Sequence, residues 1–335
     1  MYARLRMSPA LRSVRVNNRN MTRTMATMPV TVVTNTRANN PVSLERLRFI
    51  DDLEEMKKRC QAAGVKSLII TGTSLRESRN AIQLAKEHGC HPTRSTDFDK
   101  HPDGGPEGYL QALENLISAN LTGTGRVVAL DYDRTHHAPI DVQKKYFRMQ
   151  LSLAKKYHLP MFLHSRAAHK DLVQILMEEG FGTNGGRDVG GAGGVVHSFT
   201  GTVEEAKDYT PQNLEAALAI LPQWIMFETD APWCSCTSTH ASKPYLNDLP
   251  PNYRSVFFPP ATQPERFSMG KPVKGRNEPS AVGGVAWVIY RLHRKAREEA
   301  LAKGEQMEEI PFLAIAQKAY KNTIELFKLQ ELTDA

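Results

Sequence analysis

The stretch Pro160-Met-Phe-Leu-His164 opens a part of the chain in which three short apolar runs each end in a histidine or an aspartate. The second run is Gly194-Val-Val-His197, and the third is Trp224-Ile-Met-Phe-Glu-Thr-Asp230. Short apolar runs without alternation are typical of strands buried on both faces, and helical patterns lie between these runs as in βαβ units. We therefore expect three parallel strands that end at these three residues.

The side chains that end the runs should lie close together in space. His197 follows His164 by 33 residues, and Asp230 follows His197 by the same interval. In a parallel β/α barrel, however, the C-terminal ends of all strands point to one face, where active sites are built. A single histidine after an apolar run is usually only a polar strand end. Two imidazoles and a carboxylate at three consecutive strand ends instead favour a site for zinc, manganese or a similar divalent ion.

Four motifs in this chain resemble those of the TatD-related metal-dependent deoxyribonucleases. They are Met161-Phe-Leu-His-Ser-Arg166, Val196-His-Ser-Phe-Thr-Gly201, Glu228-Thr-Asp-Ala-Pro-Trp233 and Arg276-Asn-Glu-Pro279. The resemblance covers roughly residues 47–329 and implies an α/β fold, a TIM-type (β/α)8 barrel. It also implies a divalent metal ion (Mg, Mn or Zn) and hydrolysis of phosphodiester bonds in DNA, in single strands or at ends. In that pattern His164, His197 and Asp230 are metal ligands, and Asp230 is also the catalytic residue that orients the attacking water.

Four further residues are candidates for binding the substrate. Arg166 and Arg276 carry guanidinium forks that suit a phosphate, and for each of them a surface salt bridge is the alternative. In the family, the histidine of a Gly-x-His-Pro motif reaches the substrate phosphate, which implies this role for His91. Asn277 belongs to the Arg276–Pro279 motif, and the resemblance implies a substrate contact for it as well.

The chain departs from the family pattern at two motifs that supply metal ligands. The family opens with an Asp-x-His or His-x-His pair, whereas here the first candidate strand, residues 48–51, passes directly into Asp52-Leu-Glu. The family's Gly-Glu-x-Gly-Leu-Asp-Tyr run survives only as Val127-Val-Ala-Leu-Asp-Tyr-Asp133, without the glutamate. Asp131 and Asp133 are candidates to replace that glutamate in part.

Two strands also have no counterpart in the sequence. One is expected before Gly89, where a helical pattern runs straight into Gly89-Cys-His-Pro92, and the other between Tyr209 and Asn213. A barrel is closed by hydrogen bonds all round, so missing strands leave open edges. We therefore expect an incomplete or distorted barrel.

The remaining elements follow from periodicity and from glycine and proline positions. Residues 180–194 are rich in glycine and predict a mobile loop, and residues 232–276 predict a long loop over the site, either a phosphate-binding lid or a solvated surface loop. We expect further strands over residues 67–72 and 126–130, and helices over residues 74–87, 108–120, 142–156, 167–179, 213–221, 282–299 and 310–329.

Length and composition bound the domain organisation. With 335 residues the chain can form one large α/β domain, and we assign residues 44–331 to the hydrolase domain. Residues 1–40 contain seven arginines and no lysine or acidic residue, which is typical of a mitochondrial transit peptide. Residues 1–43 are therefore predicted to be a disordered or targeting extension. The expected location is cytoplasmic or nuclear, or mitochondrial if this extension directs import.

Charge and cysteine content narrow the partners. A net charge of +7 favours a polyanion such as DNA, and neither a membrane nor an obligate protein partner is indicated. The four cysteines show no disulfide framework, so a reducing compartment is expected. A small zinc cluster is not expected from Cys234, Cys236 and His240. The two cysteines are one residue closer than in the usual Cys-x-x-Cys motif, and the sequence has no second cysteine pair of this kind.

Two other functions compete with DNA hydrolysis. Because ligand motifs are missing, the chain is alternatively a catalytically impaired relative that acts as a binding or interaction module. An amidohydrolase acting on a small amide or lactone ranks third, since such enzymes usually need an early His-x-His and a metal-bridging lysine. Cleavage of a labelled single strand that depends on Mg²⁺ or Mn²⁺ and is abolished by a chelator separates the first function from the second.

Overall fold

The structure is a computed structural model that describes residues 30–35, 52–71, 88–89, 92–119, 126–182, 184–199, 205, 225–236, 240 and 242–328. Its strands are β1 (Val30–Asn35), β2 (Val65–Thr71), β3 (His88–Gly89), β4 (Arg126–Asp131), β5 (Met161–Arg166) and β6 (Gly194–His197). Its α-helices are α2 (Leu53–Ala62), α4 (Gly105–Ser118), α5 (Ile140–Lys156), α6 (His169–Glu178), α8 (Lys243–Leu246), α9 (Pro251–Phe257), α10 (Val282–Ala302) and α11 (Phe312–Phe327). The 3-10 segments are η2 (Pro92–Asp97), η3 (Tyr132–Arg134), η4 (Asn184–Val189), η5 (Pro264–Arg266) and η6 (Pro279–Ala281).

Two parallel sheets form the centre of the described molecule. The larger has four strands in the order β3-β4-β5-β6, and the smaller pairs β1 with β2. Helices α4, α5 and α6 connect the four successive strands, as in consecutive βαβ units. This strand order, with each strand beside the next one in the sequence, is that of a β/α barrel wall.

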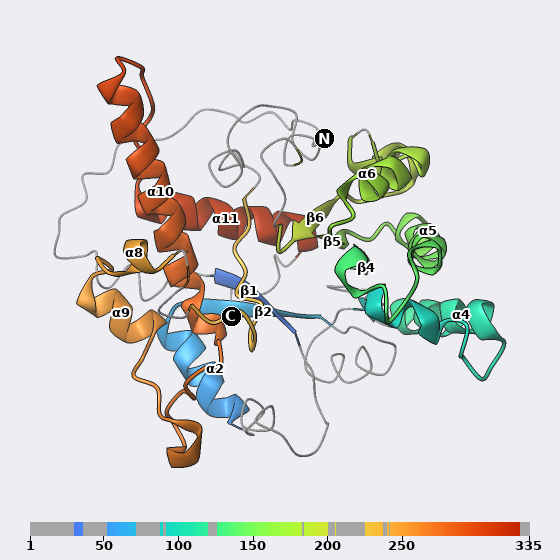
Figure 1. Cartoon of the computed structure of the whole chain (residues 1–335), viewed down its shortest axis with the longest axis horizontal. Helices are drawn as coiled ribbons and strands as arrows, with labels where there is room; N and C mark the ends of the chain where they lie inside the picture. Colours follow the sequence, from blue (N-terminus) through green and yellow to red (C-terminus); the bar gives the residue numbers. More distant parts are fainter. Residues whose placement is uncertain are drawn as a thin grey trace.

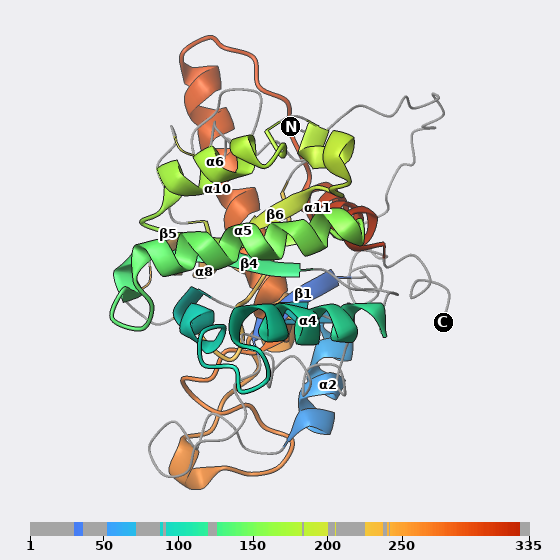
Figure 2. The same ribbon diagram turned by 90° about the vertical axis from the view of Figure 1, so that its right-hand side faces the viewer.

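Helices cover the larger sheet on one side of the molecule (Figures 1 and 2). Helix α5 presents Phe147 and Leu151 to the strands, where they pack with Leu130 of β4 and Leu163 of β5. Its neighbouring face buries Tyr146 against α4. The apolar residues of α5 therefore recur at helical spacing on two adjacent faces, which fixes this helix between the sheet and α4.

A second core lies among α2, α9, α10 and α11 on the opposite side (Figure 1). A smaller buried cluster joins the two sheets, because Ile69 of β2 packs with Phe162 of β5 and Phe327 of α11. None of the helices within the described residues combines the length and the apolar composition that a bilayer-spanning segment needs.

Most expected elements that fall within the described residues are confirmed. The strands expected at residues 67–72, 126–130, 160–164 and 194–197 are β2, β4, β5 and β6. The helices expected at residues 108–120, 142–156, 167–179, 282–299 and 310–329 are α4, α5, α6, α10 and α11, with ends displaced by a few residues. The helices expected at residues 74–87 and 213–221 lie outside the described residues.

The strand predicted for the third apolar run is wrong, because Ile225–Asp230 is not a strand in this structure. Ile225, Phe227 and Thr229 are buried while the alternate residues are partly exposed, so the run keeps the two-residue alternation of an extended chain. It has no assigned ladder to a neighbouring strand in the part of the chain that is described. The buried amide of Asn322 on α11 instead donates to the carbonyl of Ile225 at 2.8 Å.

Four further segments differ from expectation. A short strand, β3, covers His88 and the first residue of the Gly-Cys-His-Pro motif and pairs with β4, because two residues suffice for a parallel bridge. Strand β1 lies within the first 43 residues, which composition placed outside the fold. The supposed loop at residues 232–276 contains α8 and α9, and the glycine-rich stretch at residues 180–194 contains η4. Proline at the first turns of α8 and α9 starts these helices without the apolar periodicity that marks longer ones.

Candidate metal centre and substrate site

Two histidines lie side by side at the ends of neighbouring strands. His164 of β5 and His197 of β6 are direct partners in the parallel register, and their ring centroids are 5.8 Å apart. Paired residues of adjacent strands point to the same face of a sheet, so the register itself brings these rings together. Both side chains are largely buried, with 18% and 12% of their surface exposed.

Each of the two rings also has a carboxylate beside it. The Nδ1 atom of His197 lies 2.5 Å from Oε2 of Glu228, and the other carboxylate oxygen, Oε1, accepts from the backbone N–H of Ser198. The Nε2 atom of His164 lies 3.4 Å from Oδ2 of Asp131, which is 3% exposed. A carboxylate that accepts from Nδ1–H fixes the imidazole orientation and leaves Nε2 to face the site.

Asp230 completes the predicted set of metal ligands and lies within electrostatic reach of both histidines. Burial raises the pKa of Asp230, although the nearby His197 and His164 oppose this shift. Burial would lower the pKa of His197, but the hydrogen bond and negative charge of Glu228 outweigh it, so the pKa is raised. The four groups therefore form one coupled electrostatic cluster.

Backbone conformation also distinguishes the ends of the three site segments. Ala167 after β5, Ser198 after β6 and Asp230 itself have φ values of 51°, 47° and 50°. This left-handed region is unfavourable for residues other than glycine, and such residues tend to cluster where a protein holds functional groups. All three lie at the segment ends that the sequence singled out.

These imidazole and carboxylate donors are of the kinds that bind a divalent ion. Ligand atoms about 2.1 Å from one tetrahedral ion lie about 3.4 Å apart, and two imidazoles that share an ion have ring centres up to about 6 Å apart. The His164–Asp131 and His164–His197 separations of 3.4 Å and 5.8 Å agree with these values. Among the described residues, however, no three His, Cys, Asp or Glu side chains already converge as ligands of one ion. The register pairs the two imidazoles, and no third donor in the described part of the chain meets them at one point.

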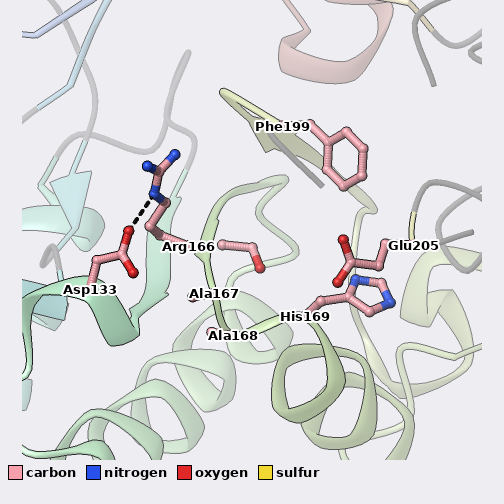
Figure 3. A pocket seen from close by; sticks show the side chains of 8 residues that line it. Asp133, Arg166, Ala167, Ala168, His169, Phe199 and Glu205 are labelled. Atoms are coloured by element: carbon pink, nitrogen blue, oxygen red, sulfur yellow. Dashed lines mark hydrogen bonds and ion pairs between the residues drawn. The ribbon is translucent and has the colours of Figure 1, made fainter. Parts of the chain in front are cut away.

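The predicted substrate residue Arg166 lies beside a cavity at the C-terminal ends of β4 and β5 (Figure 3). The cavity has a volume of about 330 Å³. Arg166 is 49% exposed, and its Nε donates to Oδ2 of Asp133 at 2.7 Å. Figure 3 shows this pair on one side of the cavity, with Phe199, His169 and Glu205 on the other. Asp133 thus pairs with Arg166, and Asp131 is the carboxylate beside His164.

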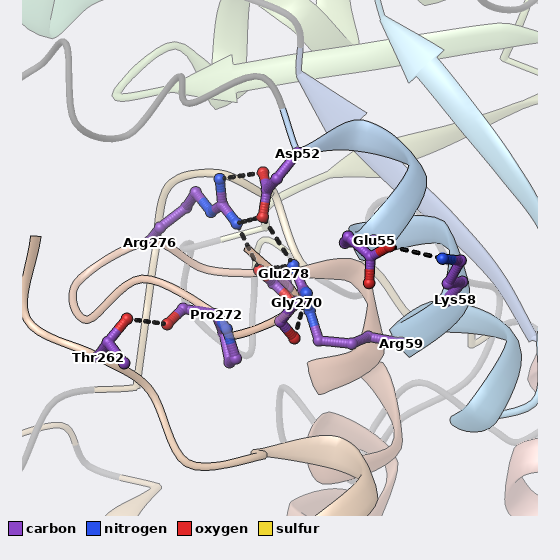
Figure 4. A network of polar contacts seen from close by, with 9 residues as sticks. All are labelled: Asp52, Glu55, Lys58, Arg59, Thr262, Gly270, Pro272, Arg276 and Glu278. Atoms are coloured by element: carbon purple, nitrogen blue, oxygen red, sulfur yellow. Dashed lines mark hydrogen bonds and ion pairs between the residues drawn. The ribbon is translucent and has the colours of Figure 1, made fainter. Parts of the chain in front are cut away.

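Arg276 lies elsewhere, in a buried ion network (Figure 4). Its guanidinium donates to both oxygens of Asp52 at 2.7 Å each and to Glu278 at 2.8 Å, and only 7% of the side chain is exposed. Arg59 binds the same two carboxylates. These bonds commit the Arg276 fork to carboxylates in this structure, so its expected phosphate contact stays a prediction.

Asn277 contacts the Asp230 turn, and His91 lies outside the described residues. Sequence reasoning did not assign a role to Glu228, the carboxylate that holds His197. A usable signal was present in the run Glu228-Thr-Asp230, because residues two apart in an extended chain share one face.

The parallel strands, each beside the next in the sequence and joined by helices, place the chain in the class of β/α-barrel folds. A crystal structure titled as an uncharacterized amidohydrolase from Saccharomyces cerevisiae matches with a TM-score of 0.64 and 22% identity, covering 89% of this chain and 99% of that one. The chain belongs to the TatD related DNase family, whose model matches residues 41–328.

Two curated relatives agree with this membership. The "Deoxyribonuclease Tat-D" of Schizosaccharomyces pombe is 36% identical over 282 residues, covering 76% of this chain and 85% of the relative. The "3'-5' ssDNA/RNA exonuclease TatD" of a Rahnella species is 30% identical over 218 residues, covering 57% of this chain and 77% of the relative. The chain is therefore a TatD-type hydrolase.

Proposed function

We propose that this protein is a metal-dependent deoxyribonuclease that hydrolyses phosphodiester bonds in DNA, in single strands or at ends. The observation that carries the proposal is the register pairing of His164 and His197, which sets two largely buried imidazoles 5.8 Å apart between carboxylates. The nuclease names of the S. pombe and Rahnella relatives support the phosphodiester as the bond that is cleaved.

The ion would be held by His164, His197 and Asp230, with Asp131 as the carboxylate that takes the place of the missing glutamate. A bound divalent ion supplies a water of lowered pKa and polarises the phosphoryl oxygen. Glu228 fixes the His197 ring through Nδ1, so that Nε2 keeps one direction. Asp230 would also orient the attacking water through its carboxylate.

The cavity beside Arg166 is the proposed place for the nucleotide next to the cleaved bond. Its volume of about 330 Å³ lies at the lower end of ligand cavities, so it suits one nucleotide of a single strand or a frayed end. Arg166 would bind a phosphate oxygen with its fork, and Phe199 offers a ring on which a base can stack. The net charge of +7 adds attraction to the phosphate backbone.

The competing proposal is a catalytically impaired relative that acts as a binding or interaction module. One observation favours it, namely that no three donor side chains within the described residues already converge on one point. The two proposals differ in a single measurable property, which is cleavage that depends on a divalent ion.

The test uses purified full-length protein and a 5′-labelled single-stranded DNA with Mg²⁺ or Mn²⁺, with and without chelator. We expect cleavage that the chelator abolishes and that His164→Ala or His197→Ala reduces at least about a hundredfold. His293→Ala, which removes an imidazole from α10, is the matched control and should cleave as the wild type does. Cleavage that persists in chelator, or an absence of cleavage with either ion, would refute the proposal.

A further inference from the structure

The tripeptide Arg276-Asn277-Glu278 lies between α2 and the turn that carries Asp230. We propose that Asn277 is a positioning residue that holds the Asp230 carboxylate in place, and that its two neighbours supply the rigid frame for it. This inference rests on the proposed function, because the Asp230 carboxylate is there assigned to the ion and the attacking water. It replaces the substrate contact that the family resemblance implied for Asn277.

Asn277 binds the Asp230 turn on both sides. Its side-chain Nδ2 donates to the carbonyl of Thr229 at 2.7 Å, one residue before Asp230, and lies 3.5 Å from the carbonyl of Cys234. Its backbone N–H donates to the carbonyl of Pro232 at 3.0 Å. One residue therefore contacts three carbonyls of a six-residue turn, and the turn closes around it.

The turn needs such a support, because its central residue has an unfavourable backbone conformation. Asp230 has a φ of 50°, in the left-handed region that residues other than glycine adopt at a cost. Within the turn the N–H of Trp233 donates to the carbonyl of Asp230 at 2.9 Å, and Cys234 Sγ donates to its carboxylate at 3.3 Å. These local bonds close the turn on itself, and the Asn277 bonds fix the closed turn to the rest of the fold.

The frame that carries Asn277 is anchored by buried ion pairs. Arg276 and Glu278 join Asp52 and Arg59 in a network whose four side chains are at most 10% exposed. Figure 4 shows both guanidinium groups turned toward the Asp52 and Glu278 carboxylates. Because the residues on both sides of Asn277 are tied to α2, its amide has little freedom to move away from the turn.

The hydrogen-bonding groups of Asn277 are already engaged within the protein. An asparagine amide has two N–H donors and one carbonyl oxygen. Here Nδ2 faces the Thr229 and Cys234 carbonyls, and Oδ1 accepts from the N–H of Glu278 at 3.0 Å. A side chain with these partners acts on the Asp230 carboxylate through the backbone and has no donor directed at a substrate phosphate.

The test compares two single variants, each of which removes an asparagine amide that binds a backbone carbonyl of the segment leading to Asp230. Asn277→Ala removes the amide at the turn, and Asn322→Ala removes a buried amide that binds the Ile225 carbonyl at 2.8 Å, five residues before Asp230. Both should lose thermal stability to a similar extent. We expect Mn²⁺ affinity, measured by calorimetry, and kcat on labelled single-stranded DNA to fall at least about tenfold in Asn277→Ala only, with KM unchanged.

A readout without metal separates the inference from the proposed function. Amide hydrogen exchange at Trp233 should accelerate at least about tenfold in Asn277→Ala and stay unchanged in Asn322→Ala. Asn277→Asp, which keeps the side-chain shape but lacks the donors, should behave as Asn277→Ala and provides a second route if the alanine variant does not fold. If the wild type neither binds Mn²⁺ nor cleaves DNA, the proposed function fails, and the Trp233 exchange rates still decide the positioning role.

Two outcomes would overturn the inference. A rise in KM of Asn277→Ala with unchanged kcat and Mn²⁺ affinity would show that Asn277 contacts the substrate. Equal exchange at Trp233 in the Asn277 and Asn322 variants would show that the turn keeps its conformation without the Asn277 amide.

Discussion

Asp52→Asn should be among the most destabilising single substitutions in the described part of the chain. The Asp52 carboxylate is 3% exposed, accepts two bonds from Arg276 at 2.7 Å each and one from Arg59 at 3.0 Å. The substitution keeps the side-chain volume, so no cavity arises. It removes one negative charge and turns an amide NH₂ toward two guanidinium groups, which have only donors.

The magnitude follows from what remains in the network. Two guanidinium groups and two carboxylates balance in the wild type, whereas the variant leaves two buried cations with Glu278 alone. Removing one partner of a buried ion pair costs about 3–5 kcal/mol. Since Glu278 still accepts from Arg59 at 2.7 Å and from Arg276 at 2.8 Å, we expect the lower end, about 3 kcal/mol.

The assay is urea unfolding of the variant and of a matched control, Glu54→Gln. Glu54 pairs with a lysine on the same helix but is 77% exposed, so its loss should cost at most about 1 kcal/mol. The double variant Asp52→Asn/Glu278→Gln should lose less than the sum of its two single variants, because the residues act in one network. A free energy of unfolding for Asp52→Asn equal to that of the control would refute the reasoning.

Three further predictions concern ligand binding, thiol reactivity and pH. Asp133→Asn frees the Arg166 fork from a half-exposed ion pair worth at most about 1 kcal/mol, so the KM for single-stranded DNA should fall about two- to fivefold in steady-state assays. Burial, together with nearby carboxylates, raises the pKa of Cys60 to about 12 and that of Cys234 to about 11. After treatment with iodoacetamide at pH 8, mass spectrometry should therefore find Cys60 unmodified and Cys234, which is exposed, modified slowly. Modification of Cys234 should become faster as the pH rises. Burial alone would raise the pKa of Asp52, but the two guanidinium groups beside it outweigh burial and lower it. Ionised Asp52 therefore contributes its full stabilisation above the unfolded pKa of about 4, and this contribution is lost as the pH falls through the lower folded pKa. The free energy of unfolding of Asp52→Asn should lack this loss when it is measured as a function of pH in acid.

The sequence was sufficient for the strands that carry the histidines. The apolar run before His164 is buried and the run before His197 is partly buried, so composition identifies both strands. The two rings meet because the register of the parallel strands pairs them. Asp230 was located by the same pattern, but its run is not a strand. An apolar run indicates only that a segment is largely buried, and a ladder also requires a partner strand, which a local pattern does not contain.

The roles of Arg276 and Asn277 could not be obtained from local pattern either. A guanidinium that binds phosphate and one that binds a buried carboxylate look the same in sequence, and only the fold brings Asp52 to within 2.7 Å of Arg276 from 224 residues away. Glu228 was missed for a related reason, because its partner His197 lies 31 residues away along the chain. Polar pairs between residues far apart in the sequence determine the geometry of the site, and they produce no periodic pattern from which they could be predicted.

The buried network of Asp52, Arg59, Arg276 and Glu278 gives the protein two separate responses to ionic strength. Its four charges sum to zero and are shielded from solvent, so dissolved ions should weaken the joint between α2 and the Asp230 turn very little. Attraction between the +7 chain and a phosphate backbone acts through water and is screened as salt is added. A rise in salt concentration should therefore weaken nucleic-acid binding at concentrations that leave the buried ion network and the Asp230 turn intact.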